Sequence, residues 1–308
     1  MKSSTAQYVM GIDFGSTTSK TVILDRAGNM VASAIAHKGS VSNDGAMVSM
    51  AEALQQAGIT EADIARAVST GYGRRMLDIA DKSYTEITCH ARGAVHLVPD
   101  ARLVIDIGGQ DSKVIAVDAN GLVSQFAMND RCAAGTGKFL EALARAVQVP
   151  LEEMGPMAMT AVEHLSISNM CATFAETEVV ALLAEGKRKH DVLGAVHAAI
   201  ASRTLGLIAR VGKREPVVMT GGVAKNVAAV HHLEQVLGMK LRIPPDPQIA
   251  GALGAALFAL DEITSPDHAD EEDRVDTEMA AARCGTPTCT AKKPLPANVH
   301  PLHGPALH

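Results

Sequence analysis

An eight-residue motif that occurs twice constrains the fold of this chain more than any other feature of its 308 residues. The pattern D-x-G-x-x-x-S-K covers residues 13–20 and returns at residues 106–113. Each copy follows an apolar stretch typical of a buried strand, and each is predicted to begin a β-hairpin. Because an internal repeat indicates a duplicated structural unit, we expect two copies of one strand–turn–strand unit.

The repeated motif contains the parts of a phosphate-binding site. A glycine-containing turn after a strand exposes backbone N–H groups that bind phosphate, and an Asp at the strand end can hold Mg²⁺ through water. Two copies that face each other predict a clamp, in which one hairpin binds the β-phosphate and the other binds the γ-phosphate. Asp13 and Asp106 would then lie around the metal. Two ordinary glycine turns are the alternative, which the match between the copies disfavours.

A third glycine-rich turn lies within residues 217–224, V-V-M-T-G-G-V-A. The pattern predicts a buried strand that breaks into the turn Gly221-Gly222 and then into a helix. Adjacent glycines let a flat base or a ribose approach the backbone closely, so this turn is a candidate nucleoside site. A simple strand–helix connection is the alternative.

Hydrophobic periodicity predicts secondary structure along most of the chain. The predicted strands are 8–13, 20–25, 30–37, 66–69, 103–106, 113–117, 122–127 and 217–220. The predicted helices are 46–57, 88–98, 137–147, 172–184, 193–211 and 250–260. Gly251 and Gly254 would allow the last helix to pack closely. His90 and His197 fall in predicted helices and are expected to be structural residues.

Composition excludes several classes of function. Aromatic residues make up only 3% of the chain and the formal net charge is −6, which is unlike a nucleic-acid-binding protein with stacking platforms and a basic surface. The apolar run Ile249–Leu260 is too short to cross a bilayer, and the polar start Met1–Gln7 has no signal region. We therefore expect a cytoplasmic protein that binds neither nucleic acid nor membrane. Residues 261–308 lack periodicity, and their acidic, Pro-rich composition predicts a disordered tail.

Two cysteines stand out because each precedes a predicted helix: Cys132 and Cys171. The N–H groups at a helix N-terminus lower the pKa of a thiol and favour an anionic cluster. A four-iron cluster needs four thiolates, and two per chain become four only across a two-fold axis. Two small buried residues are the alternative, since no C-x-x-C pattern is present. Cys89 is predicted as a core residue, and Cys284 and Cys289 receive no role.

The paired hairpins and the turn at 219–223 resemble the ATPase superfamily of actin, sugar kinases and heat-shock chaperones. More narrowly, residues 8–260 resemble the activator of 2-hydroxyglutaryl-CoA dehydratase and the ATPase subunits of benzoyl-CoA reductase. The segment 129–137, N-D-R-C-A-A-G-T-G, is the specific part, since kinases and chaperones of this fold lack it. The other segments that carry the resemblance are 11–17, 70–74, 106–111 and 251–257.

The resemblance implies an α/β fold of two duplicated actin-like (ribonuclease H-like) ATPase lobes with a nucleotide cleft between them. The first lobe would comprise residues 1–99 and be completed by the last helix, 249–260. The second lobe would comprise residues 100–248 and carry the cluster cysteines.

ATP and Mg²⁺ would occupy the implied cleft. The resemblance makes Asp13, Asp106 and Gln110 the catalytic residues, with Gln110 near the γ-phosphate and its attacking water. The implied nucleotide-binding residues are Gly15, Ser16, Thr17, Lys20, Gly108, Gly109, Gly221, Gly222 and Gln248.

The resemblance further implies a homodimer, or a dimer with a related subunit, that holds one 4Fe–4S cluster at its interface through Cys132 and Cys171. ATP hydrolysis would drive low-potential one-electron transfer to a benzoyl-CoA reductase or 2-hydroxyacyl-CoA dehydratase partner, with a reducing ferredoxin or flavodoxin upstream. Residues 89–95 favour the reductase branch slightly, whereas 129–137 and 108–110 are typical of dehydratase activators. The alternatives are a small-molecule kinase of the same fold without a cluster, and a chaperone-like or filament-forming ATPase.

Overall fold

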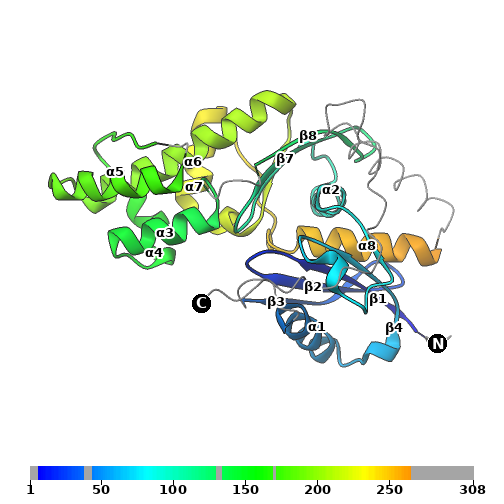
Figure 1. Ribbon diagram of the computed structural model, residues 1–308. Helices are drawn as coiled ribbons and strands as arrows, with labels where there is room; N and C mark the ends of the chain where they lie inside the picture. Colours follow the sequence, from blue (N-terminus) through cyan, green and yellow to red (C-terminus); the bar gives the residue numbers. More distant parts are fainter. Residues whose placement is uncertain (1–5, 38–43, 130–133, 169–170, 265–308) are drawn as a thin grey trace, which may run out of the picture.

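Two α/β lobes make up the computed structural model, which describes residues 6–37, 44–129, 134–168 and 171–264 (Figure 1). The first part of the chain contains β1 (Tyr8–Phe14), β2 (Ser19–Asp25), β3 (Met30–Ala36), α1 (Asp44–Ala57), β4 (Ile64–Thr70), β5 (Lys82–Ser83) and α2 (Glu86–Leu97). The second part contains β6 (Leu103–Ile107), β7 (Ser112–Val117), β8 (Val123–Asn129), α3 (Gly137–Val147), α4 (Leu151–Ala158), α5 (Ala172–Ala184), α6 (Lys189–Val211), β9 (Val217–Thr220), α7 (Val227–Leu237) and α8 (Ala250–Thr264). Short 3₁₀ helices cover Glu61–Asp63, Arg74–Met76 and Gly222–Lys225.

The two sheets share one topology. Their strand orders are β3-β2-β1-β4-β5 and β8-β7-β6-β9, and in each an antiparallel meander is joined by a parallel strand. The repeated motif has the same register in both sheets, because Asp13 pairs with Lys20 and Asp106 pairs with Lys113. The duplicated unit predicted from the repeat is therefore confirmed.

Helices α2 and α8 lie between the two sheets and join the lobes (Figure 1). Helix α8 packs on β1, β2 and β4, while α2 packs on α8 and on β6, β7 and β8. Glycines permit this approach, since a Cβ at Gly254 would overlap the carbonyl of Cys89 and a Cβ at Gly93 would overlap that of Ala250. The close packing predicted for Gly254 is confirmed, and Cys89 is the core residue that the sequence predicts.

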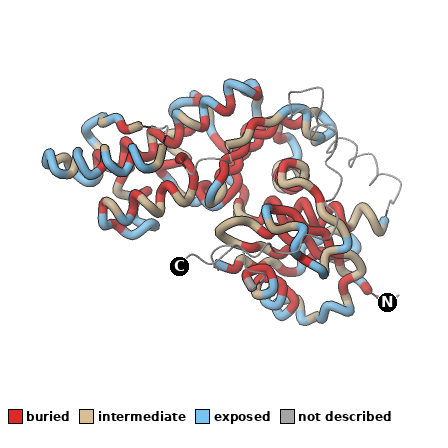
Figure 2. Tube along the Cα trace, in the orientation of Figure 1, coloured by how far each residue is buried: buried red, intermediate tan, exposed pale blue. Residues whose placement is uncertain are grey.

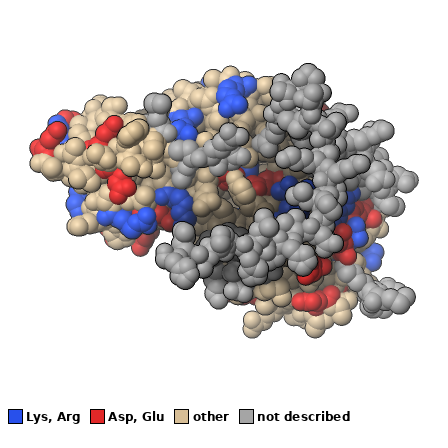
Figure 3. All heavy atoms as spheres, viewed as in Figure 1, with Lys and Arg blue, Asp and Glu red and all other residues tan. Residues whose placement is uncertain are grey.

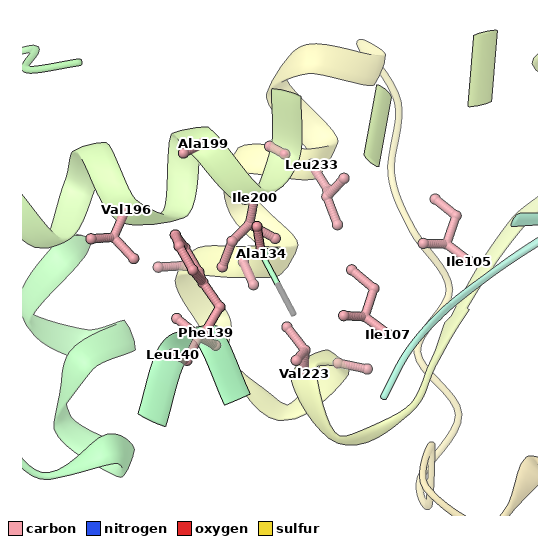
Figure 4. Close-up of a cluster of buried hydrophobic side chains, with 14 of the residues drawn as sticks. Ile105, Ile107, Ala134, Phe139, Leu140, Val196, Ala199, Ile200, Val223 and Leu233 are labelled. Carbon is pink, nitrogen blue, oxygen red and sulfur yellow. The ribbon is translucent and has the colours of Figure 1, made fainter. Parts of the chain in front are cut away.

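The core of the second lobe lies between its sheet and helices α3, α6 and α7 (Figure 4). Helix α6 runs through the centre of this core. By length and composition alone, α6 is also long and apolar enough to cross a membrane. Of its apolar window, 67% is buried inside the protein, as expected for a central helix of a folded domain.

Most predicted elements match the structure within a few residues, and 137–147, 172–184 and 217–220 match at both ends. Helix α4 was not predicted, whereas α7 is the helix that the sequence predicts, without bounds, after the turn Gly221-Gly222. Helix α4 contains Pro156, which weakens a helix prediction because proline lacks the N–H that bonds to the carbonyl four residues earlier.

The boundary of the tail at residue 261 is wrong, because α8 continues to Thr264. Asp261 pairs with Arg92 at 2.9 Å, and Glu262 pairs with Arg66. By their acidic composition, Asp261 and Glu262 were predicted to belong to the tail. Their ion pairs with the two arginines instead hold them in α8. The remaining tail, 265–308, lies outside the described residues, as do its two cysteines.

Candidate nucleotide-binding site

A cavity of about 480 Å³ lies between the lobes. Both repeated hairpins line it, together with α3, α4 and the glycine turn after β9. Acidic side chains and basic side chains lie close together between the lobes on the face shown in Figure 3. The predicted site residues among its lining are Asp13, Gly15, Ser16, Thr17, Lys20, Asp106, Gly108, Gly109, Gly221, Gly222 and Gln248.

Two of the predicted site residues that the structure describes, Gln110 and Cys171, do not line this cavity. Gln110 follows Gly109 at the tip of the second hairpin, and it is exposed. Cys171 lies at the start of α5, and Cys132 lies outside the described residues. The structure therefore brings together the residues predicted for the nucleotide, apart from Gln110, and keeps Cys171 away from them.

The first hairpin places a lysine and a carboxylate side by side in the cavity. Lys20 Nζ donates to Asp13 Oδ2 at 2.9 Å. Burial acts to raise the pKa of Asp13, but the positive charges of Lys20, His90 and Lys113 outweigh it and hold the pKa below its usual value. Asp13 is therefore ionised at neutral pH, as a ligand of hydrated Mg²⁺ must be.

The second hairpin surrounds its carboxylate with more partners. Thr220 Oγ1 donates to Asp106 Oδ1 at 2.8 Å, His90 Nδ1 lies 3.2 Å from the same oxygen, and Lys113 Nζ lies 3.6 Å from Oδ2. Burial acts to raise the pKa of Asp106, but the charges of His90 and Lys113 and the bond from Thr220 hold it well below its usual value. This carboxylate is also ionised.

Lys113 is the centre of a buried charge cluster that the sequence analysis did not assign to the site. Its Nζ lies 2.9 Å from Glu86 and bonds to Asp111 as well as facing Asp106. Burial acts to lower the pKa of Lys113, but the three carboxylates raise it well above its usual value. The repeat could have predicted that Lys113 lies at the site, because Lys113 occupies the position that Lys20 has in the first copy.

His90 is the second residue that the sequence analysis left out of the site. A Cβ at Gly251 would lie 2.8 Å from His90 Nε2 and 3.2 Å from Asp13 Oδ2, so α2, α8 and the first hairpin meet at this glycine. Burial acts to lower the pKa of His90, but the charges of Asp106 and Asp13 raise it above its usual value. His90 lies in a helix as predicted, and it lines the cavity and faces the carboxylates of both hairpins.

The tips of the two hairpins touch. A Cβ at Gly109 would overlap Thr17 Oγ1, and this buried hydroxyl has no hydrogen-bond partner among the described residues. The second tip is also bonded to α3, because the N–H of Gly137 donates to Gly108 O at 2.9 Å and the N–H of Lys138 donates to Gly109 O at 2.8 Å. The tip of the second hairpin is thus hydrogen-bonded directly to the start of α3.

The site can bind a polyphosphate and its metal ion. Glycine turns line the cavity, Lys20 supplies a positive charge, Thr17 supplies a hydroxyl without a partner among the described residues, and two ionised carboxylates line the same space. Duplicated hairpins of one register around such a cavity define an ATPase of the actin, sugar-kinase and heat-shock-chaperone class.

Comparison with known proteins gives the family within this class. The BadF/BadG/BcrA/BcrD ATPase family matches residues 10–259, and the chain belongs to this family. The activator of lactoyl-CoA dehydratase from Anaerotignum propionicum is 45% identical over 252 residues, which are 82% of this chain and 97% of that protein.

Two further relatives bear on the nucleotide and on the partner. The structure of the activator of the 2-hydroxyisocaproyl-CoA dehydratase from Clostridium difficile, with bound ADPNP, is similar with a TM-score of 0.79 and 40% identity, covering 87% of this chain and 97% of that one. A benzoyl-CoA reductase component from Thauera aromatica is 35% identical over 211 residues, 67% of this chain and 74% of that protein. The chain is thus more similar to these two dehydratase activators than to the benzoyl-CoA reductase component.

Cys171 has the environment that the sequence analysis predicts for it. It is the N-cap of α5, and the N–H groups of Phe174 and Thr173 lower the pKa of its thiol. Within the described part of the chain, no three metal-binding side chains of the His, Cys, Asp or Glu type come together. A metal centre at Cys171 would therefore need ligands from the segment with Cys132 or from a second chain.

Helix α5 presents apolar side chains to the surface next to Cys171. Phe174 is 64% exposed and Val180 is 52% exposed, and Figure 2 shows the helix as a largely exposed arm at one end of the protein. Only Ala175 and Val179 of this helix are buried. An exposed apolar surface of this kind is typical of a protein–protein interface.

Proposed function

We propose that this protein is an ATP-hydrolysing electron donor that drives low-potential one-electron transfer to a 2-hydroxyacyl-CoA dehydratase, or to a related benzoyl-CoA reductase. The observation that carries the proposal is the bonded contact between the second hairpin and the start of α3. It links a nucleotide site directly to the helix that follows Cys132. The identity to dehydratase activators supports the choice of partner.

ATP and Mg²⁺ fit the cavity on its own chemistry. Gly15, Ser16 and Lys20 would contact the phosphates, and Asp13 and Asp106 would hold the hydrated metal ion. The buried hydroxyl of Thr17, unpaired among the described residues, would gain a phosphate oxygen as its partner.

The remaining contacts of the nucleotide follow from the other side of the cavity. Gly108 and Gly109 would lie against the terminal phosphate, and the N–H of Gly109 would donate to it. Gly221 and Gly222 would admit the nucleoside, with Gln248 beside them. Gln110, next to Gly109, would turn inward to orient the attacking water.

A 4Fe–4S cluster fits the cysteine chemistry. The lowered pKa of Cys171 favours the thiolate that an iron ligand needs. Two such cysteines per chain, Cys132 and Cys171, would supply four ligands in a dimer, and the exposed apolar face of α5 supports a partner chain at this end. The cluster would supply one-electron redox chemistry between a reducing ferredoxin or flavodoxin and the dehydratase component.

The chain's own residues would perform the coupling. Phosphates bound by both hairpins would draw the lobes together. Because the N–H groups of Gly137 and Lys138 are hydrogen-bonded to the tip of the second hairpin, α3 would move with that tip. The environment of the cysteine segment then changes with the state of the nucleotide, and the potential of a cluster depends on such hydrogen bonding and exposure. We propose that the reaction takes place in the cytoplasm.

Iron and sulfide analysis of oxygen-free preparations tests this function. We expect a brown dimer with about four iron atoms, the number in one 4Fe–4S cluster, and an ATPase activity. Cys132→Ala and Cys171→Ala should each lose the iron, whereas Cys89→Ala, at a buried core position, should retain it. A colourless, iron-free and monomeric wild-type protein would contradict the proposal and leave a kinase or another ATPase of this fold.

A further inference from the structure

The duplication of the two lobes extends to a second pair of turns, which follow the parallel strands β4 and β9. Asp13 of the first hairpin pairs with Thr70 of β4. Asp106 of the second hairpin pairs with Thr220 of β9 in the same way. A glycine with positive φ follows each threonine, with a φ of +91° after β4 and +85° after β9. The two turns are therefore counterparts, and the sequence predicted a ligand site only for the turn after β9.

The turn after β4 is packed closely against the first hairpin. A Cβ at Gly71 would overlap the carbonyl of Phe14 and would lie 2.7 Å from Asp13 Oδ1. A Cβ at Gly73 would overlap the ring of Phe14, and the N–H of Gly73 donates to Phe14 O at 3.0 Å. Because the close approach requires glycine on both sides, Tyr72 supplies the one side chain at the centre of this turn.

Tyr72 lines the nucleotide cavity, and its residue surface is 52% exposed. Among the described residues that line this cavity, it is the only phenylalanine, tyrosine or tryptophan. A tyrosine combines an apolar ring with a hydroxyl that can donate a hydrogen bond to an anionic oxygen. The turn after β4 thus brings a hydrogen-bond donor to the cavity, close to the carboxylate of Asp13.

The position of Tyr72 in the first lobe points to one part of the nucleotide. The counterpart turn, Gly221-Gly222, belongs to the second lobe and lines the same cavity. In the proposed function this counterpart turn admits the nucleoside, and the phosphates lie between the two hairpins. A nucleotide that extends from the second lobe toward the first therefore brings its terminal phosphate toward the turn that contains Tyr72.

We propose that the hydroxyl of Tyr72 donates a hydrogen bond to the terminal phosphate of the bound ATP. This inference rests on the proposed function, in which ATP occupies the cavity. The contact exists with ATP and is absent with ADP, which lacks the terminal phosphate. Since the N–H of Gly73 is bonded to Phe14 at the end of β1, the contact also joins the terminal phosphate to the first hairpin through this turn.

Calorimetric titration with a non-hydrolysable ATP analogue and with ADP tests the contact. Tyr72→Phe should bind the analogue about tenfold more weakly, the factor expected for one lost hydrogen bond to a charged group. Its affinity for ADP should change by less than about twofold. Tyr8→Phe is the matched control, because Tyr8 begins β1 and does not line the cavity. Unchanged affinity for the analogue, or an equal loss for both nucleotides, would overturn the proposal.

Tyrosine fluorescence gives a second measurement, because the chain contains three tyrosines and no tryptophan. The analogue should alter the emission of the wild type and of Tyr8→Phe, and Tyr72→Phe should lose most of this change. Tyr84 is buried and donates to Glu262 at 2.9 Å, so its contribution should be small. Equal changes in the three proteins, or no change in any of them, would contradict the contact.

Iron analysis of the same preparations separates this inference from the proposed electron transfer. If the wild-type protein binds the analogue but holds no iron, the electron transfer fails, and the affinities alone still decide the contact of Tyr72. If the wild type holds iron and binds the analogue no better than Tyr72→Phe does, only the contact fails. A wild-type protein that binds neither nucleotide would refute both.

Discussion

The two hairpins carry the same motif in the same register, yet their lysines have different environments. Lys20 is 14% exposed, faces the cavity and bonds to one carboxylate. Lys113 lines the same cavity but is only 2% exposed and is surrounded by three carboxylates, with His90 nearby. The lysine of the first copy is thus partly accessible and has one carboxylate partner, whereas the lysine of the second copy is the centre of a buried ion cluster.

The largest difference between the two lysines should appear in their contributions to the free energy of unfolding. Lys113→Met should lower the free energy of unfolding by about 3–5 kcal/mol, because it leaves three buried carboxylates without their common counter-ion. Chemical denaturation followed by circular dichroism measures this effect. The same change at the first hairpin, Lys20→Met, is the control. If both variants lose the same stability, the comparison between the hairpins fails.

Lys20→Met should act on ligand binding instead. We expect at least about a tenfold loss of affinity for ATP, since a charge-assisted contact to phosphate is removed. The loss of stability should stay near 1–2 kcal/mol, about the value of one charged hydrogen bond. Calorimetric titration with a non-hydrolysable ATP analogue measures the affinity. Wild-type affinity in this variant would show that the first lysine is structural as well.

His90 should make the stability of the second cluster depend on pH. Its pKa is about 6.5 in the unfolded chain and higher in the folded protein, so its contribution is complete below pH 6.5 and is lost as the pH rises through the folded pKa. The advantage of the wild type over His90→Gln should therefore shrink by up to about 1.4 kcal/mol per pH unit above pH 6.5. Denaturation of the metal-free proteins between pH 6 and 9 measures this slope, and a constant difference would contradict it.

The smallest effect concerns the contact between the two tips. Gly109→Ala places a methyl group against Thr17 Oγ1 and should push the hairpins apart. We expect about a threefold weaker ATP affinity, which corresponds to about 0.7 kcal/mol of binding free energy. Gly206→Ala is a control for the added methyl group, since no atom lies within 4 Å of a Cβ at that position. Equal affinity in wild type and Gly109→Ala would show that the tips need not touch.

Much of the fold and of the site follows from local sequence. The repeat predicted the paired hairpins, and the two carboxylates at 13 and 106 face one cavity as expected. Glycine turns and alternating apolar residues are local signals, so they can be read from a single chain. The tail boundary was wrong because Asp261 and Glu262 are held by Arg92 and Arg66, which lie far away in sequence.

The environment of the second lysine is a product of the tertiary structure alone. In sequence, Lys20 and Lys113 are equivalent, and the spacing in the motif determines their place at the start of a strand. Only the packing of α2 on the second sheet brings Glu86 and His90 to Lys113 and withdraws it from solvent. Burial strengthens every charge interaction at once, and burial depends on neighbours that no local pattern specifies.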